Sequence, residues 1–342
     1  MKFATGPLAH TALFGLDAKQ YTIDDIGVFG GGTPLNLLNP VYTTTVRPSG
    51  APFQSGVITQ RMGGAYFQDQ IKFDRWTLDL SGRYDLVSTK NENRIGPYQS
   101  GSDGQFSGRA GLSYQLPMGF APYVTYATSY NPVIGTNTMT GALLEPETGV
   151  QTEVGVKYQP EGFNGHIAVG YFDLTRQNVL TTTPGAPPIT SQTGEVSSNG
   201  IELEAVLNPM PGLKLVGAFT AYNFEITNDG NPANIGLTLP AVPEQFASVW
   251  ADYTFQSGPL AGFGFGAGVR YVGESYADTA NTLVVPAYTL FDAAVHYEVG
   301  GWRAAINIAN IADKTYVASC ASPDACYYGE RFRATASLGY KW

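Results

Sequence analysis

The chain contains few charged residues. Only 14% of its 342 residues are Asp, Glu, Lys or Arg, and the formal net charge is −9. A protein that neutralises nucleic-acid phosphates needs a basic surface, so this balance argues against a nucleic-acid partner. Hydrophobic residues make up 43% of the chain, yet they never form the run of about 18 apolar residues that a membrane-spanning helix needs.

The sequence also lacks the motifs of common enzymes. Its histidines, His10, His166 and His296, lie far apart, and neither an HExxH spacing nor a G-x-S-x-G elbow is present. The stretch GFGFGAG at 262–268 contains G-x-G-x-x-G elements, but VRYVGESY after it continues a strand period where a dinucleotide loop needs a helix. We therefore expect no enzyme, no cofactor and no metal site. We interpret these glycines as the inner face of a strand, leaving room for whatever fills the interior.

Strict alternation of apolar and polar residues is what the sequence has in abundance. The last eleven residues, FRATASLGYKW, place apolar or aromatic residues at every even position from Phe332 to Trp342. The same period of two recurs at 76–85, 153–158, 201–207, 213–220, 263–271, 291–298 and 302–308. This period is typical of a β-strand whose two faces meet different solvents. No charge falls on the apolar positions of these stretches, as selection by lipid would produce, because Arg or Lys there costs about 2 to 4 kcal/mol.

The connections between the alternating stretches come in two sizes. Short ones rich in Gly, Pro and Asn lie near residue 73 and at 115–122, 159–165, 208–212, 256–262 and 298–301. Longer polar ones lie at 19–57, 90–103, 131–147, 181–192, 227–242, 278–286 and 318–326. Short turns at one end and long loops at the other are typical of bacterial outer-membrane barrels. The sequence thus predicts an all-β fold, an antiparallel transmembrane β-barrel of about fourteen strands, in one domain over residues 1–342; a soluble β-sandwich is the alternative.

Polar positions of the predicted strands carry charges of both signs toward the lumen. They include Asp79, Arg83, Glu153, Glu202, Glu204, Arg270, Asp292, Arg303, Arg331 and Arg333. An aqueous pore tolerates such charges, and so does the polar surface of a domain that fills the barrel, so alternation does not choose between them.

Aromatic residues form two predicted groups. Those at strand ends fit an interfacial girdle: Tyr123, Tyr126, Tyr130, Tyr253, Tyr297 and Tyr340. Those in or beside the long connections are candidates for lining a ligand vestibule: Tyr98, Tyr130, Tyr276, Tyr327 and Tyr328.

The two cysteines, Cys320 and Cys326, bracket ASPDA in the last long connection. A zinc pair is the rival interpretation, but no further Cys exists and no His is close in sequence. An even pair in an exported loop predicts a disulfide. Closing so small a ring restricts the unfolded chain by about 2 kcal/mol.

Five stretches resemble the barrel of TonB-dependent siderophore receptors. They are PETGVQTEVGVKY (146–158), YFDLTRQNV (171–179), SSNGIELEA (197–205), NIANIADKTYVASC (307–320) and CYYGERFRATASLGYKW (326–342). The last two are most similar to the ferrichrome and other ferric-hydroxamate receptors. The resemblance implies a Gram-negative outer-membrane protein that takes up a ferric siderophore, with iron present only as the chelate. It also implies four partners: outer-membrane lipid, the TonB complex, a plug domain, and the barrel assembly machinery, which would read the last strand with Tyr340 and Trp342.

The sequence also departs from that family. Its members carry a TonB box and a plug inside a barrel of about 22 strands. Neither feature is recognisable here, and HTALFGLD at 10–17 resembles a mid-barrel strand of the family. We therefore expect a plug-less, C-terminal barrel fragment that lacks about eight strands and depends on TonB only in the complete protein. The alternative is a self-closed barrel that acts as a passive, porin-like diffusion channel.

Overall fold

The computed structural model describes residues 1–28, 30, 36, 38–41, 50–183 and 189–342, and its regular secondary structure is almost entirely β-strand. Fifteen strands form one antiparallel sheet. They are β1 (Lys2–Thr5), β2 (Leu8–Val28), β3 (Pro52–Phe73), β4 (Trp76–Asn93), β5 (Gln99–Tyr114), β6 (Phe120–Asn131), β7 (Glu147–Tyr158), β8 (Gly165–Thr183), β9 (Ile189–Met210), β10 (Leu213–Asn228), β11 (Gln245–Thr254), β12 (Phe263–Val272), β15 (Tyr288–Val299), β16 (Trp302–Ala309) and β19 (Arg333–Tyr340). Two short hairpins, β13 (Ser275–Tyr276) with β14 (Val284–Val285) and β17 (Val317–Ser322) with β18 (Ala325–Tyr328), lie in the long connections.

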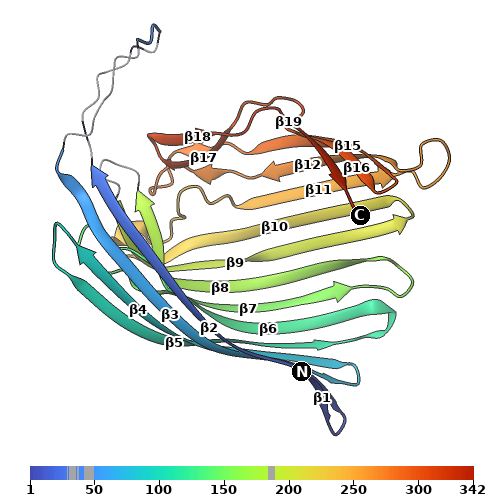
Figure 1. Cartoon of the computed structure of the whole chain (residues 1–342), viewed down its shortest axis with the longest axis horizontal. Helices are drawn as coiled ribbons and strands as arrows, with labels where there is room; N and C mark the ends of the chain where they lie inside the picture. Colours follow the sequence, from blue (N-terminus) through green and yellow to red (C-terminus); the bar gives the residue numbers. More distant parts are fainter. Residues whose placement is uncertain (29, 31–35, 37, 42–49, 184–188) are drawn as a thin grey trace.

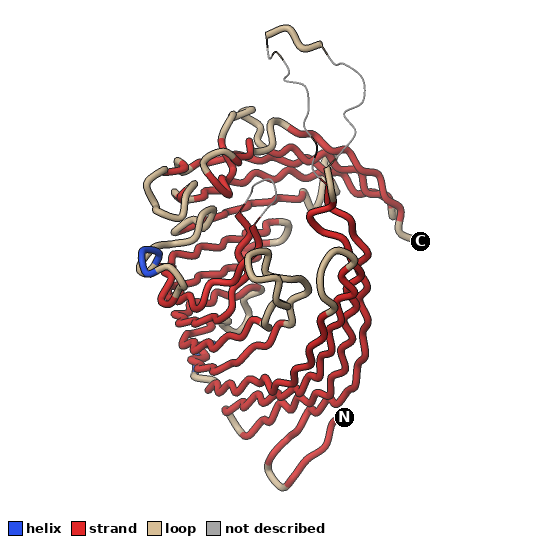
Figure 2. The backbone as a smooth tube through the Cα atoms, turned by 90° about the vertical axis from the view of Figure 1, so that its left-hand side faces the viewer, coloured by secondary structure: helices blue, strands red, loops and turns tan. Residues whose placement is uncertain are grey.

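The sheet curves around a hollow interior, with strands that neighbour each other in sequence paired in order (Figures 1 and 2). The predicted all-β, antiparallel, barrel-type fold is confirmed. Its two edges, β1 and β19, do not pair with each other, so the described part of the chain forms an open barrel wall. None of the described residues form a helix long and apolar enough to cross a membrane.

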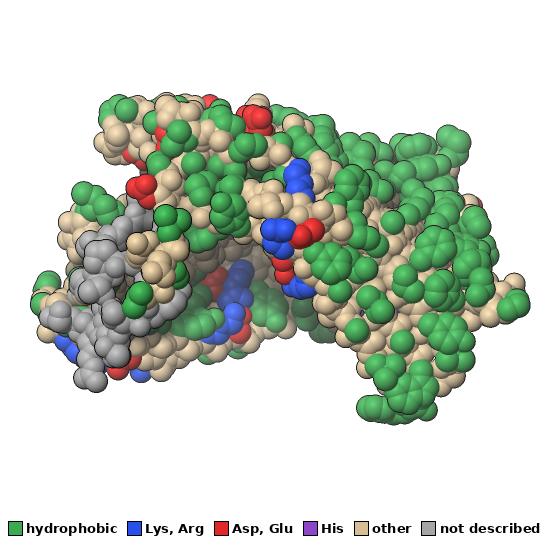
Figure 3. Space-filling view, turned by 90° about the horizontal axis from the view of Figure 1, so that it is seen from above, with side chains coloured by type: hydrophobic (Ala, Val, Ile, Leu, Met, Phe, Trp, Pro, Cys, Tyr) green, Lys and Arg blue, Asp and Glu red, His purple; other side chains and the backbone are tan. Residues whose placement is uncertain are grey.

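The two faces of the wall differ as the alternation predicts. Phe291, Ile306 and Leu338 expose 53%, 49% and 70% of their surface on the outer face. Figure 3 shows apolar side chains over much of the outside and charged ones around the central hollow. Aromatic pairs such as Trp302 and Tyr340, whose ring centroids are 4.9 Å apart, mark the end with short turns. An apolar outer band with aromatic residues at its edge is the surface that lipid requires.

The short turns form where residues that tolerate positive φ occur. Asp74, between β3 and β4, has φ 49°. Gly212, between β9 and β10, has φ 87°, and a Cβ there would lie 2.2 Å from the carbonyl oxygen of Thr254. Only glycine fits that position, and the tight turn sets the register of β9 against β10.

Several predicted loop boundaries were wrong. β2 and β3 stay paired out to Val28 and Pro52, and β4 and β5 leave only residues 94–98 between them, so much of the predicted loops 19–57 and 90–103 is strand. The sheet has fifteen strands where about fourteen were expected, because the short β1 adds to the count. Beyond the membrane both faces of a strand meet water, so alternation fades although the backbone ladder continues. Parts of the predicted loops 19–57 and 181–192 lie outside the described residues.

Small apolar clusters support the connections at the loop end. Val179 of β8, Val196 of β9 and Ile226 of β10 form one buried cluster, and Leu239 of the β10–β11 connection packs against it. Ala277, Val285 and Cys320 form a second, with Val317 packed against it. The first cluster therefore anchors the β10–β11 connection to the wall, and the second joins the two short hairpins.

Candidate functional site

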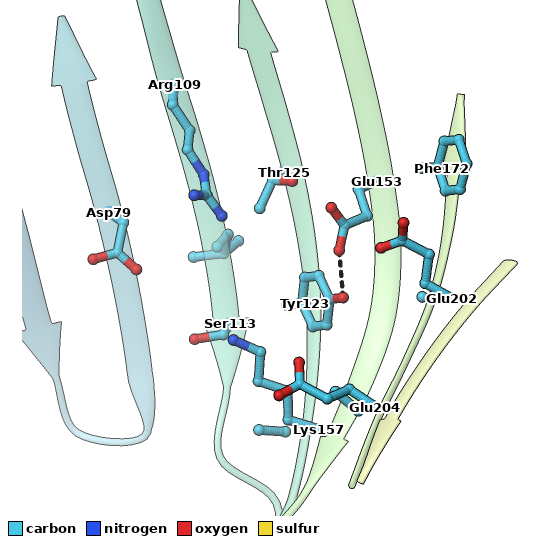
Figure 4. A pocket seen from close by; sticks show the side chains of 15 residues that line it. Asp79, Arg109, Ser113, Tyr123, Thr125, Glu153, Lys157, Phe172, Glu202 and Glu204 are labelled. Carbon is cyan, nitrogen blue, oxygen red and sulfur yellow. Dashed lines mark hydrogen bonds between the residues drawn. The ribbon is translucent and has the colours of Figure 1, made fainter. Parts of the chain in front are cut away.

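The main candidate site is a polar pocket of about 290 Å³ on the inner face of β4–β9 (Figure 4). Its charged lining residues are Asp79, Arg109, Glu153, Lys157, Glu202 and Glu204. Four of the ten residues predicted to face the lumen, Asp79, Glu153, Glu202 and Glu204, meet in this pocket although they come from three strands, β4, β7 and β9.

Tyr123 is the central neutral group of the pocket. Its hydroxyl donates to the Glu153 carboxylate at 2.5 Å. A Cβ at Gly155, the residue paired with Tyr123, would meet the Tyr123 ring at 2.7 Å, so the glycine makes room for that ring. The interpretation of Tyr123 as a girdle residue was wrong, because its position on β6 shares the inner face with Thr125. The opposing glycine was the available signal.

The pocket carries an excess of negative charge. Four carboxylates face two cations, Arg109 and Lys157. The Lys157 ammonium lies 5.3 Å from the centre of the Tyr123 ring, and neither cation forms an ion pair within 4 Å among the described residues. Such a surface favours a partner that presents cationic groups.

Other predicted lumen charges are already paired. Arg83 forms ion pairs with Asp17 and Asp85, each at 2.6 Å, and lies over the Tyr66 ring. Arg270 pairs with Asp292. The Asp292 carboxylate also accepts from the backbone N–H of Asn310 at 2.9 Å, which fixes the start of the last long connection. These groups stabilise the wall and leave little capacity for a ligand.

The three remaining arginines pair locally near strand ends. Arg303 pairs with Glu298 at 2.7 Å beside the β15–β16 turn. Arg333 pairs with Glu330 at 2.9 Å, where β19 begins. Arg331 makes a two-pronged contact with Asp313, and its guanidinium lowers the pKa of that carboxyl from 3.8 to about 2. The structure therefore does not bring these arginines into the lumen pocket.

The glycine face of β12 is filled from neighbouring strands. A Cβ at Gly264 would lie 2.2 Å from the His296 ring, and one at Gly268 would lie 2.4 Å from the Trp250 ring. The His296 Nε2 lies 3.2 Å from the Asp252 carboxylate. The predicted room is present, and two side chains of the wall itself occupy it.

The five candidate vestibule tyrosines do not converge on one site. Tyr98 lies between β4 and β5 and is 58% exposed. The Tyr130 hydroxyl donates to Asp103 of β5 at 3.1 Å. Tyr276 is on β13, whereas Tyr327 and Tyr328 are exposed on β18.

Sequence reasoning missed a pair of aromatic residues beside Arg270. The rings of Tyr288 and Tyr316 are 4.3 Å apart. A Cβ at Gly329 would lie 1.9 Å from the Tyr316 ring, so the glycine of YYGER is required for this packing. That glycine was the available signal, although sequence gives no indication of which ring it accommodates.

Cys320 and Cys326 form a disulfide that closes the β17–β18 hairpin, as predicted. Cys320 is 3% exposed and packs with Ala277 and Val285 of the β12–β15 connection. The disulfide hairpin and the β13–β14 hairpin therefore share one buried cluster.

A curved antiparallel sheet with an apolar outer face and a charged inner face defines a protein of the outer-membrane β-barrel class. The sequence profile described as "TonB dependent receptor-like, beta-barrel" matches residues 2–311, and the chain belongs to this family. Its location is accordingly the outer membrane.

Relatives extend the match over the whole chain. The ferrichrome outer membrane transporter/phage receptor of Escherichia coli is 35% identical over 100% of this chain and 47% of that protein. The ferrioxamine B receptor of Salmonella typhimurium is 34% identical over 98% of this chain and 48% of its own length. The chain spans about half the length of these relatives, which are receptors and transporters, and it is not an enzyme.

Solved structures share the fold. The siderophore receptor PiuA of Acinetobacter baumannii superimposes with a TM-score of 0.79 and 22% identity, over 100% of this chain and 54% of that one. The ferric-catecholate import receptor Fiu of E. coli superimposes with a TM-score of 0.79 and 21% identity, over 98% of this chain and 52% of that one.

Proposed function

We propose that the chain is the C-terminal part of the barrel of an outer-membrane receptor that takes up a ferric siderophore of the hydroxamate type. The observation that carries this proposal is the 34–35% identity to ferrichrome and ferrioxamine B receptors over nearly the whole chain. The complete protein would be energised through TonB, and the iron would be cargo bound in its chelate.

The open sheet supports the incomplete-barrel part of the proposal. β1 and β19 each present one edge without a partner strand in the described part of the chain. A bilayer interior offers no water to an unpaired backbone edge, so in the membrane either further strands cover both edges or the two edges pair with each other. In this proposal the rest of the receptor supplies the further strands, and the chain alone is not competent for transport.

We also propose that the lumen pocket contacts a cationic surface of the plug domain in the complete protein. Its four carboxylates outnumber its two cations, Arg109 and Lys157. Among the described residues, neither cation forms an ion pair with one of these carboxylates, so their negative charge is available to a partner. Replacing Glu153 and Glu202 by Gln would loosen the plug, measured as faster amide exchange in the plug with unchanged exchange in the barrel strands. The control is Glu298→Gln, which lies at a turn; equal effects from both variants would contradict the assignment.

Growth of a receptor-null Gram-negative strain on ferric chelates tests the main proposal. The complete receptor should restore TonB-dependent growth on a ferric hydroxamate, and residues 1–342 with an export signal should not. Growth only on a ferric catecholate would overturn the ligand class. A steady, ligand-independent conductance of the refolded chain in planar bilayers would instead support the passive channel.

A further inference from the structure

Residues 132–146, which connect β6 to β7, fold back against the inside of the curved wall, and we name this segment the strap. Figure 2 shows loop segments lying within the curve of the strands. A Cβ at Gly101 of β5 would lie 3.4 Å from Leu143 of the strap, and Gln99 of β5 donates to the Gly141 carbonyl at 2.6 Å. Gln60 of β3, only 2% exposed, donates to the Val133 carbonyl at 3.4 Å. The strap therefore covers the inner face of β3–β5.

The strap is also fastened to β9. The Thr138 N–H donates to the Thr190 carbonyl at 2.9 Å, and the Thr190 N–H donates back to the Thr138 hydroxyl at 2.8 Å. A second reciprocal pair of hydrogen bonds joins Glu145 and Gln192. The Glu145 N–H donates to the side-chain oxygen of Gln192 at 3.0 Å, and the side-chain amide of Gln192 donates to the Glu145 carbonyl at 2.7 Å. The strap thus ties two separate parts of the wall together.

Its own backbone is hydrogen-bonded into a tight hairpin. The Asn137 N–H donates to the Ala142 carbonyl. The Asn137 side-chain oxygen accepts from the N–H groups of Met139 and Thr140. The Leu144 N–H donates to the Gly135 carbonyl at 3.1 Å, and the Leu144 side chain is buried. Moving the strap away from the wall would break its contacts with β3–β5 and with β9 at the same time, and it would expose Leu144.

We infer that the strap is a fixed bar that limits the size of the ligand reaching the lumen, which makes it a specificity element of the uptake proposed above. Glu145 is its only charged residue, so it selects by shape more than by charge. A moving gate would need weak contacts on at least one side, whereas reciprocal hydrogen bonds hold this segment at β9 and a buried glutamine holds it at β3.

Thiol accessibility tests the bar without requiring transport. The two native cysteines are bonded to each other, so Gln99→Cys, at the half-buried residue that donates to the Gly141 carbonyl of the strap, introduces the reporter. Ser100→Cys, the exposed neighbour on the opposite face of β5, is the matched control. A small methanethiosulfonate should label both, and a polyethylene-glycol maleimide should label residue 99 more than about tenfold more slowly than residue 100. Replacing residues 136–143 by Gly-Gly should abolish that difference. Equal labelling by the bulky reagent with the strap intact would overturn the inference.

A tether tests whether the strap must move. In the complete receptor, oxidised Thr138→Cys/Thr190→Cys should take up radioactive iron as a hydroxamate chelate at the rate of the single variant Thr138→Cys. Lost uptake in the tethered protein alone would show that the strap is a gate and overturn the inference. If the wild-type receptor takes up no ferric chelate, the proposed function fails, and the labelling experiment still decides the strap.

Discussion

The Nδ1 of His10 lies 2.7 Å from the carboxylate of Asp69 on the outer, lipid-facing side of the wall. Asp69 pairs in register with Ala12 and Leu80 and shares its face of β3 with Phe67, opposite to the lumen-facing Gln70. The ring of His10 is stacked on that of Phe3 at 4.6 Å. An ionisable pair among the apolar residues of this face fixes register, because a one-residue slip would separate its members.

Breaking the His10–Asp69 pair should destabilise the barrel more than removing it entirely. We expect His10→Ala to cost about 3 kcal/mol, since Asp69 would be left without its partner beside lipid, and the double Ala variant to cost less. Urea unfolding from phospholipid vesicles measures both. The matched control is the hydrogen bond that Gln70, the residue after Asp69, donates to Asp79 at 3.0 Å on the lumen face. If Gln70→Ala proved as costly as His10→Ala, the outward location would not explain the effect.

Adding a methyl group at Gly264 should disturb the lumen wall. The new Cβ would lie 2.2 Å from the His296 ring, which must then swing away from Asp252. Overpacking of this kind costs about 1 to 3 kcal/mol. Thermal unfolding of Gly264→Ala measures the cost against Gly217→Ala on β10, where the nearest atom would be 3.8 Å away. A stable Gly264→Ala with an intact His296–Asp252 contact would contradict the assigned role of the glycine.

Removing the disulfide should loosen two hairpins rather than one. Replacing Cys320 and Cys326 by Ser releases a restraint of about 2 kcal/mol on a short ring and places a hydroxyl in the cluster with Ala277 and Val285. Proteases should then cut within both hairpins, while the melting temperature of the sheet stays nearly constant. Ser322→Ala, in the same hairpin, is the control. Cleavage confined to 317–328 would show that the shared cluster does not couple the hairpins.

Acid should weaken the contact between Asp313 and Arg331 only at low pH. The folded pKa of Asp313, about 2, lies below the ordinary 3.8, so the stabilisation is complete above pH 4 and is lost as the pH falls toward 2. The Phe332 N–H donates to the same carboxylate at 2.9 Å. Its amide chemical shift should therefore titrate with a midpoint near 2, and Arg331→Gln should move that midpoint upward. An unchanged midpoint would exclude the guanidinium as the cause.

The sequence by itself determined that the two faces of each alternating strand meet different surroundings. Phe291 and Asp292 must point to opposite sides because successive side chains of a strand alternate, whatever the rest of the chain does. The disulfide could likewise be predicted from the chain alone, since its partners are separated by a short, closable loop. Beyond residue 19 of β2 both faces of the strand are polar, so alternation carried no information there. The predicted start of the loop at residue 19 was therefore wrong.

Only the tertiary structure decided which inner side chains meet. Tyr123, Glu153 and Glu202 come from three strands, and their contact depends on the register and curvature of the sheet. The same holds for the strap, whose partners Gln60 and Thr190 lie on strands not adjacent to β6 or β7. Local periodicity is set by the geometry of one strand, whereas contacts across a curved wall are set by the packing of many strands.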